Sequence, residues 1–148
     1  MKKMICRERR HTMNILVIDG QGGQLGSQLI KSIRARYPGL HITAVGTNAN
    51  ATTAMLKAGV DRAATGENPV IVACRKADVI ICPIGIVIAD SLAGEITPAM
   101  ALAVAQADAA RILIPVQKCE NLVAGITGQS TGALVEDAAA KLAALLAE

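Results

Sequence analysis

Aromatic residues are nearly absent from this 148-residue chain, which contains Tyr37 but no phenylalanine or tryptophan. Hydrophobic residues still make up 52% of the sequence, so its core must be built from alanine, valine, isoleucine and leucine. Such a core is typical of a parallel sheet covered by helices on both faces. The length suits a single domain that folds without disulfide or metal support.

Several classes of functional site lack the residues that they need. The four cysteines show no C-x-x-C spacing, and the histidines are limited to His11 and His41. We therefore expect no metal site and no histidine-based triad. Tyr37 belongs to no Tyr-x-x-x-Lys pair, so the proton donor of short-chain dehydrogenases is missing, and no Walker lysine follows the glycines of the chain.

Long apolar runs are also missing. The longest uncharged apolar run, Val79 to Ala89, has 11 residues and contains Pro83, whereas a membrane-spanning helix needs about 20. The N-terminus lacks the apolar stretch of a secretory signal. We expect a soluble cytoplasmic protein with reduced thiols and no membrane partner.

The net charge of +3 is concentrated at the N-terminus. Five of the 15 lysines and arginines, but one of the 12 acidic residues, precede Met13, which leaves the rest of the chain with about −1. We interpret residues 1–12 as a basic extension, from an upstream start or an arm, and residues 13–148 as the domain. Because the domain has no basic stripe and no aromatic platform, no nucleic-acid partner is expected.

Strand and helix patterns alternate along the domain. The predicted strands are 14–18, 41–45, 61–65, 78–82 and 111–116, with 122–126 as an optional sixth. The predicted helices are 22–36, 50–58, 68–76, 97–107 and 131–146, and residues 84–94 form a loop with a helical turn. Asn68 and Pro69 are assigned as the N-cap and first residue of one helix, and Thr97 and Pro98 of the next.

This alternation, with its short connections, predicts the fold class. We expect a single-domain, doubly wound, Rossmann-like α/β fold with a mostly parallel sheet of five or six strands. Parallel neighbours need right-handed crossovers, which favours the strand order 3-2-1-4-5.

The segment NILVIDGQGGQLG, from Asn14 to Gly26, is the strongest functional feature. An apolar strand stops at Asp19, four glycines follow within seven residues, and a helical pattern begins after Gly26. Gly20, Gly23 and Gly26 fit G-x-x-G-x-x-G, a spacing similar to that of nicotinamide dehydrogenases. A strand, glycine turn and helix start in this order make the phosphate-binding corner of a dinucleotide-binding unit. The alternative is that the glycines serve only close packing.

Two features depart from a standard nicotinamide site. A carboxylate such as Asp19 about 4 Å from a phosphate costs about 1 kcal/mol in water and about 4 kcal/mol at an effective dielectric of about 20. The helix start returns only about 0.3–2 kcal/mol. Asp19 must therefore point away, bond a ribose or backbone group, hold a cation, or cap the amides of its own turn. After the second strand, Gly46, Thr47 and Asn48 stand where an NAD site has an acid and an NADP site an arginine.

The carboxyl ends of parallel strands share one edge, where ligands bind at the switch point between the first and fourth strands. NAD(P) or another nucleotide is one option there. The candidate binding residues are Asp19, Gly20, Gln21, Gly22, Gly23, Gln24, Gly26, Gly46, Thr47, Asn48, Pro83, Ile84 and Gly85, with residues 65–68 and Pro115 nearby.

Two acidic residues interrupt an apolar stretch beyond this edge. Asp90 and Glu95 are candidates for a catalytic acid or base, because an apolar wall raises a carboxyl pKa. Capping a turn or helix is the alternative role. The helix at 97–107 is apolar on every face, and a small domain rarely buries such a helix alone. We expect a homodimer that uses this helix, buried alongside strands 78–82 and 111–116.

Taken together, four stretches resemble a small bacterial family known only as a domain of unknown function. They are VIDGQGG (17–23), AVGTN with ATTAMLKAGVDRAATGEN (44–48 and 51–68), ICPIGIVIADSLAGEITPAMA (81–101) and ILIPVQKC (112–119). The resemblance implies a Rossmann-like fold and brings no activity, substrate or cofactor. Residues 1–12 have no place in it.

Three functional hypotheses follow from the sequence. The first is a protein that binds a nucleotide, a dinucleotide or another phosphate-bearing ligand at the glycine corner. The second is a non-catalytic oligomeric module for regulation or assembly, in which the glycines only pack. The third is a small enzyme that acts on a phosphorylated metabolite without a dinucleotide.

Overall fold

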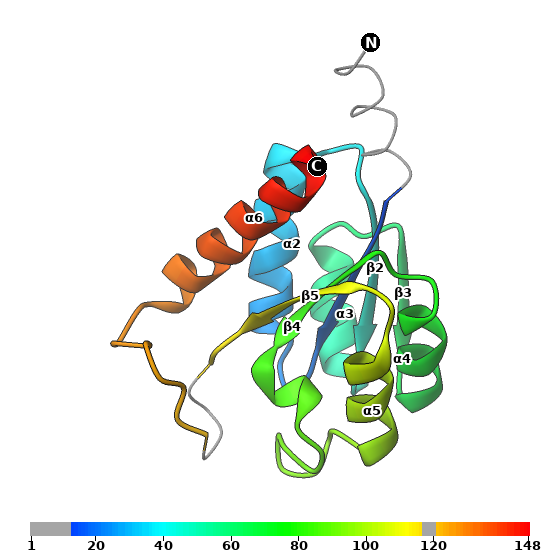
Figure 1. Cartoon of the computed structure of the whole chain (residues 1–148). Coiled ribbons are helices and arrows are strands. Elements are labelled where there is room, and N and C mark those ends of the chain that lie inside the picture. The colour runs from blue at the N-terminus through cyan, green and yellow to red at the C-terminus, as the bar shows by residue number, and fades with distance from the viewer. Residues whose placement is uncertain (1–12, 117–120) are drawn as a thin grey trace.

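A computed structural model describes residues 13–116 and 121–148, and its centre is one five-stranded sheet (Figure 1). The strands are β1 (Asn14–Asp19), β2 (His41–Gly46), β3 (Arg62–Thr65), β4 (Val79–Pro83) and β5 (Ala110–Ile114). They pair in parallel in the order β3-β2-β1-β4-β5. The predicted α/β fold and strand order are confirmed.

Helices cover both faces of the sheet (Figure 1). One face carries α2 (Gln24–Arg36), α3 (Ala49–Lys57) and α6 (Thr131–Ala147), and the other carries α4 (Glu67–Cys74) and α5 (Pro98–Gln106). Each face has its own hydrophobic cluster, and both clusters consist almost wholly of aliphatic side chains. None of the described helices is long and apolar enough to cross a membrane.

The uninterrupted apolar run of β1 follows from its central place in the sheet. Ile15 and Val17 belong to the cluster under α2, α3 and α6, whereas Leu16 and Ile18 belong to the cluster under α4 and α5. All four side chains are at most 1% exposed. Because a strand alternates its side chains between two faces, a strand buried on both sides is apolar throughout.

The prediction of a sixth strand at 122–126 is wrong. These residues form turns and irregular backbone, and Leu122 is 96% exposed. β5 pairs with β4 on one side only, and the described chain offers it no further strand. An apolar pattern without a neighbour to pair with does not make a strand.

Helix starts differ from the predictions in two places. α4 begins at Glu67 with Gly66 as its N-cap, so the assignment of Asn68 as the cap is wrong. Pro69 lies within the first turn instead, where its missing N–H costs no helical hydrogen bond. α2 begins at Gln24, two residues later than expected, with Gly23 as its N-cap. The predicted cap of α5 is confirmed, since the Thr97 hydroxyl accepts from the Met100 amide at 3.1 Å.

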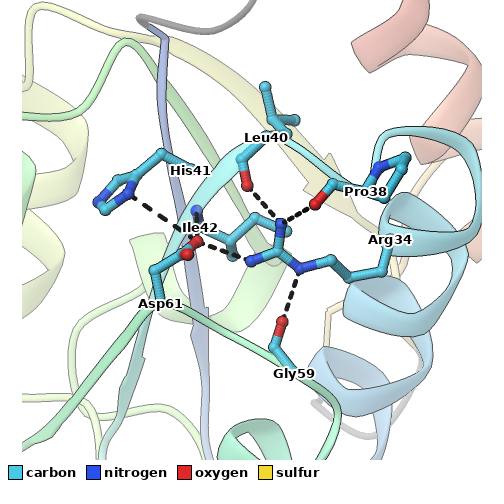
Figure 2. Close-up of polar contacts among 7 residues, drawn as sticks. All are labelled: Arg34, Pro38, Leu40, His41, Ile42, Gly59 and Asp61. Atoms are coloured by element: carbon cyan, nitrogen blue, oxygen red, sulfur yellow. Dashed lines mark hydrogen bonds and ion pairs between the residues drawn. The ribbon is translucent and has the colours of Figure 1, made fainter.

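At the end of the sheet where β2 begins, a charged cluster joins α2 to the loop before β3 (Figure 2). The Arg34 guanidinium donates to the Asp61 carboxylate at 2.6 Å and to the Gly59 carbonyl at 2.6 Å. The Ile42 amide also donates to Asp61, at 2.8 Å. Partial burial acts to raise the pKa of Asp61, but the Ile42 amide and the Arg34 guanidinium together hold that pKa below its usual value. This cluster fixes the end of the sheet that lies away from the glycine corner.

Candidate functional site

The glycine corner, residues 19–26, connects the end of β1 to the first turn of α2. The Gly23 amide donates to the Gly20 carbonyl at 3.0 Å, which closes the turn. Gly23 has a φ of 72°, in the left-handed region, and a Cβ built there would lie 2.7 Å from Cα of Ala51 on α3. The corner therefore needs glycine at this position for both its backbone conformation and its contact with α3.

The Asp19 carboxylate caps two backbone amides of this corner. Its Oδ1 accepts from the Gly20 amide at 2.8 Å, and its Oδ2 accepts from the Gly26 amide at 2.7 Å. The residue is only 5% exposed. Of the roles considered for this carboxylate, the structure has it bonding the backbone of its own turn. Two amide dipoles therefore share its charge, which weakens the repulsion that Asp19 exerts on an anion nearby.

Glu95 reaches the corner from the loop that precedes α5. Its Oε2 accepts from the Gln21 amide at 2.8 Å and from the Thr47 hydroxyl at 3.0 Å. Its Oε1 accepts from the side-chain amide of Asn48 at 2.8 Å. One carboxylate thus joins the glycine corner to the loop after β2. It accepts hydrogen bonds from the side chains of Thr47 and Asn48, which the sequence predicted to bind a ligand.

A strained turn holds Glu95 in this position. Asp90, Leu92 and Ala93 have φ values of 66°, 55° and 56°, which side chains rarely adopt. Each such residue costs about 1–3 kcal/mol and persists only where its surroundings enforce it. The Asp90 amide donates to the Ile96 carbonyl at 2.7 Å, and the Ser91 hydroxyl donates to the Gly85 carbonyl. Asp90 itself is exposed, so the two predicted acidic candidates differ in their surroundings.

Close packing accounts for most glycines of the corner, but not for Gly22. A Cβ on Gly20 would lie 2.6 Å from Glu95 Oε2, and one on Gly26 would lie 2.6 Å from Met55 Sδ. A Cβ on Gly22 would meet only Gln24 Cγ, at an ordinary 3.9 Å. Its φ is also outside the left-handed region. Neither the fold nor the backbone conformation therefore requires glycine at position 22.

Gly22 lines a cavity of about 280 Å³ beside the start of α2. The walls come from the glycine corner, from the end of β4, from the turn before Glu95 and from the first residue of α6. The lining residues are Asp19, Gly20, Gln21, Gly22, Gly23, Gln24, Leu25, Gln28, Pro83, Leu92, Val116 and Thr131. This is the β1–β4 switch point, where the strand order predicts a ligand site.

Five of these residues were not predicted from the sequence: Leu25, Gln28, Leu92, Val116 and Thr131. A signal existed for three of them. Leu25 stands between the predicted residues Gln24 and Gly26. Gln28 follows Gln24 by one helical turn, so both lie on one face of α2. Thr131 begins the helix that follows β5, and a helix after a parallel strand starts near the carboxyl edge of the sheet. Leu92 and Val116 lie in irregular segments that no sequence pattern places.

The cavity offers neutral hydrogen-bond donors. The amides of Gly22, Gln24 and Leu25 donate to no other residue in the described part of the chain. Gln24, Gln28 and Thr131 also line the space, and among the described residues no lysine, arginine or histidine does. Of the described chain, an anion bound here would meet backbone amides, the start of α2 and neutral side chains.

The other predicted residues lie outside this cavity. Thr65 bonds Thr52 through their hydroxyls at 2.6 Å, and the Gly66 amide donates to the Gly46 carbonyl at 2.9 Å. Gly85 is buried, Ile84 and Pro115 are half-buried, and all three are absent from the cavity wall. Of the expected edge residues, those from Asp19 to Gln24 and Pro83 come together around the space, whereas Gly26 is absent from its wall.

A larger cavity, of about 560 Å³, lies between α4 and the β1–β2–β3 part of the sheet. Its walls include His41, Arg62 and Lys76, with apolar side chains such as Val45 and Val72. It contains none of the glycine-corner residues. The two cavities share no lining residue and are separate sites.

Neither metal-ligand clusters nor reactive thiols mark a second site in residues 13–116 and 121–148. No three His, Cys, Asp or Glu side chains gather there around one point. Burial raises the pKa of the Cys74 thiol to about 11. Burial also raises the pKa of Cys82 in β4, so both thiols are protonated near neutral pH.

Residues 14–147 match the family described as "Domain of unknown function (DUF3842)". The match covers most of the chain. The chain belongs to this family. The family match agrees with the resemblance given by VIDGQGG and the three other stretches, and the family contributes no activity or ligand. No curated protein and no solved structure matches the chain.

Proposed function

We propose that the glycine corner binds a small phosphate-bearing ligand in the cavity between α2 and the ends of β4 and β5. The observation behind this proposal is the glycine at position 22. It lines the cavity, and packing tolerates a side chain at its position, yet the residue is glycine. A glycine that the fold does not need is expected where a ligand approaches the backbone closely.

The donors around the cavity suit a phosphate ester with hydroxyl groups. The amides of Gly22, Gln24 and Leu25 are at the positive end of α2, which favours an anion by about 0.3–1 kcal/mol at an exposed site. The Asp19 charge opposes this, but two backbone amides already bond it. Gln28 and Thr131 supply neutral groups for hydroxyls or ester oxygens.

The cavity size favours a small ligand. Pockets for drug-sized ligands have volumes of about 300–1,000 Å³, and this cavity has about 280 Å³. A sugar phosphate or a comparable phosphorylated metabolite fits a cavity of this volume better than a dinucleotide does. The third hypothesis from the sequence thereby gains weight over the nicotinamide version of the first.

A thermal-shift screen with matched variants tests the proposal. The panel contains orthophosphate, sugar phosphates, acyl phosphates, AMP, ATP, NAD, NADP, flavins and acyl-CoA. A ligand at about 100 times its Kd adds about 2.7 kcal/mol to the stability of the folded state, or about 5–10 °C for a chain of this size. We expect at least one phosphate compound to raise the melting temperature of the wild-type protein.

Two glycine variants separate binding from folding. Gly22→Ala is expected to fold normally and to lose the ligand-induced shift. Gly132→Ala is the control, because a Cβ there also meets a single atom, at 3.9 Å, and Gly132 does not line the cavity. It should retain the shift. No shift with any compound, or an equal shift in all three proteins, would contradict the proposal.

A second candidate function, assembly, is favoured by a groove between α4 and α5. Leu102 is 55% exposed there among mostly apolar neighbours such as Ile71 and Ala103. α5 packs against α4 and the single turn of 3₁₀ helix η1 (Ile84–Val87), so its outer side has no cover from the described chain. We propose this groove as the self-association surface of a homodimer. Arg75 and Asp108 at the groove are oppositely charged, as a self-complementary contact prefers.

A further inference from the structure

We infer that Glu95 restricts the corner to ligands that end at the glycine loop, by filling the path that a dinucleotide would take toward β2. This inference rests on the proposed function and names its ligand class: compounds with a single phosphate group and a small remainder on the β4 side. Dinucleotides are excluded from this class.

The position of the Glu95 carboxylate carries the inference. In a dinucleotide site of this fold, the pyrophosphate crosses the glycine corner, and a ribose meets the loop after β2. Glu95 bonds both of these places at once, through the Gln21 amide and through Thr47 and Asn48. Its Oε2 also lies over Gly20, 2.6 Å from where a Cβ would be. The carboxylate therefore takes the space and the donors that the second half of a dinucleotide requires.

The turn before Glu95 keeps the carboxylate in place. The Glu95 amide donates to the Leu92 carbonyl at 3.2 Å, and the Gly94 amide donates to the Ser91 carbonyl at 3.2 Å. Leu92 in the same turn also forms part of the wall of the open cavity. One turn thus shapes the space on the β4 side and closes the space on the β2 side. This arrangement fits a fixed selector of ligands better than a movable lid.

The negative charge of Glu95 excludes a dinucleotide in addition to the space that the side chain fills. A second phosphate at the Gln21 amide would meet the Glu95 carboxylate, and Asp19 lies beneath the same turn. Among the described residues, none of the side chains that bond Glu95 is cationic. A ligand with one phosphate at the start of α2 avoids the closed side.

Isothermal titration calorimetry with two probes tests the inference. Ribose 5-phosphate has one phosphate and a small sugar, and NAD has the extended dinucleotide form. We expect the wild-type protein to bind ribose 5-phosphate at least about tenfold more tightly than NAD. In Glu95→Ala, the affinity for NAD should rise at least about tenfold, while that for ribose 5-phosphate changes less than about threefold.

Further variants make each outcome decisive. Glu95→Gln keeps the side-chain length and loses the charge, so NAD should bind it more tightly than wild type and less tightly than Glu95→Ala. If Glu95→Ala fails to fold, Glu95→Gln must still show the gain. Asp137→Ala is the charge control, because this exposed carboxylate is on α6 and bonds only Lys141 among the described residues. It should show no gain.

The result also distinguishes this inference from the proposed function. Wild-type protein that binds NAD as tightly as ribose 5-phosphate would overturn the inference and leave phosphate binding intact. The absence of any gain in both Glu95 variants would do the same. Protein that binds neither probe in any variant, and no compound of the thermal-shift panel, would overturn both proposals.

Discussion

The carboxylate of Asp19 lies 2.7 Å from the amide nitrogen of Gly26, a residue seven positions further along the chain. With its second oxygen on the Gly20 amide at 2.8 Å, this side chain spans the whole glycine turn. A buried carboxylate that looked like an obstacle to anion binding is thus part of the frame that shapes the site.

Asp19→Asn should destabilise the folded protein. The asparagine side chain would present an NH₂ group to one of the two amides that now donate to a carboxylate oxygen. Losing a buried, charge-assisted hydrogen bond in this way costs about 1.5–3 kcal/mol. Urea denaturation measures this loss as a lower transition midpoint with an unchanged slope.

Asp137→Asn provides the control for this measurement. Asp137 is exposed on α6 and pairs only with the exposed Lys141 among the described residues, and we expect its substitution to change stability by less than about 0.5 kcal/mol. If Asp19→Asn were as stable as this control, the carboxylate would not be holding the corner together.

Gly23→Ala and Gly22→Ala should differ in stability although the two positions are adjacent. Alanine at Gly23 must adopt a φ of 72°, which costs about 1–2 kcal/mol. Its Cβ must also fit 2.7 Å from Cα of Ala51, and such overpacking costs about 1–3 kcal/mol. We expect a fall in melting temperature of at least about 5 °C by calorimetry.

Gly22→Ala should melt within about 2 °C of wild type, because an exposed position without strain tolerates substitution. An equal loss of stability in both variants would show that Gly22 also serves packing. The observation behind the proposed function would then disappear.

The Arg34–Asp61 pair should give a pH-dependent contribution to stability. The Asp61 pKa is lower in the folded protein than the unfolded value of about 3.9. The contribution is therefore complete above that value and is lost as the pH falls through the folded pKa. Because both side chains are partly exposed, we expect Asp61→Asn to cost only about 1 kcal/mol at pH 7.

Urea midpoints at pH 7 and pH 3 check this expectation. The difference between wild type and Asp61→Asn should shrink at the lower pH. Arg34→Lys should also destabilise the protein at pH 7, because lysine cannot reach Gly59 and Asp61 with a planar fork. A difference that is the same at both pH values would contradict the assigned role of Asp61.

Leu102→Glu should shift the protein toward the monomer if the α4–α5 groove is the dimer surface. A charge at the centre of an apolar contact is costly to bury. Leu56→Glu is a matched control, since Leu56 is 54% exposed on α3, which covers the opposite face of the sheet. Light scattering at micromolar concentration should find wild type and Leu56→Glu dimeric. A wild-type monomer, or an equal effect of both substitutions, would count against this surface.

Local patterns predicted most of the fold. The apolar run of β1 indicated a strand, and the glycine turn after Asp19 with the helical spacing beyond it indicated a β–turn–α unit. Alternation of strands and helices then left few topologies, because parallel crossovers are right-handed. The failed sixth strand shows the limit of this reasoning, since an apolar stretch such as 122–126 becomes a strand only beside a partner.

The candidate site was only partly predictable. Glu95 contacts Gln21 across 74 residues of sequence, and no local pattern indicates that contact. The strained turn before it contains Leu92 and Ala93 at positive φ, against the preferences of both residues. Tertiary packing decides such positions. Cytoplasmic location and the role of residues 1–12, which lie outside the described residues, stay predictions.

A ¹H–¹⁵N correlation spectrum recorded during titration with ribose 5-phosphate tests the central claim most directly. We predict saturable shifts of the Gly22, Gln24 and Leu25 amides, together with the side-chain amide of Gln28, while residues around the larger cavity such as Val72 and Lys76 stay unchanged. Saturable shifts confined to that larger cavity, or no saturable shift at the glycine corner with any phosphate compound of the panel, would contradict the account.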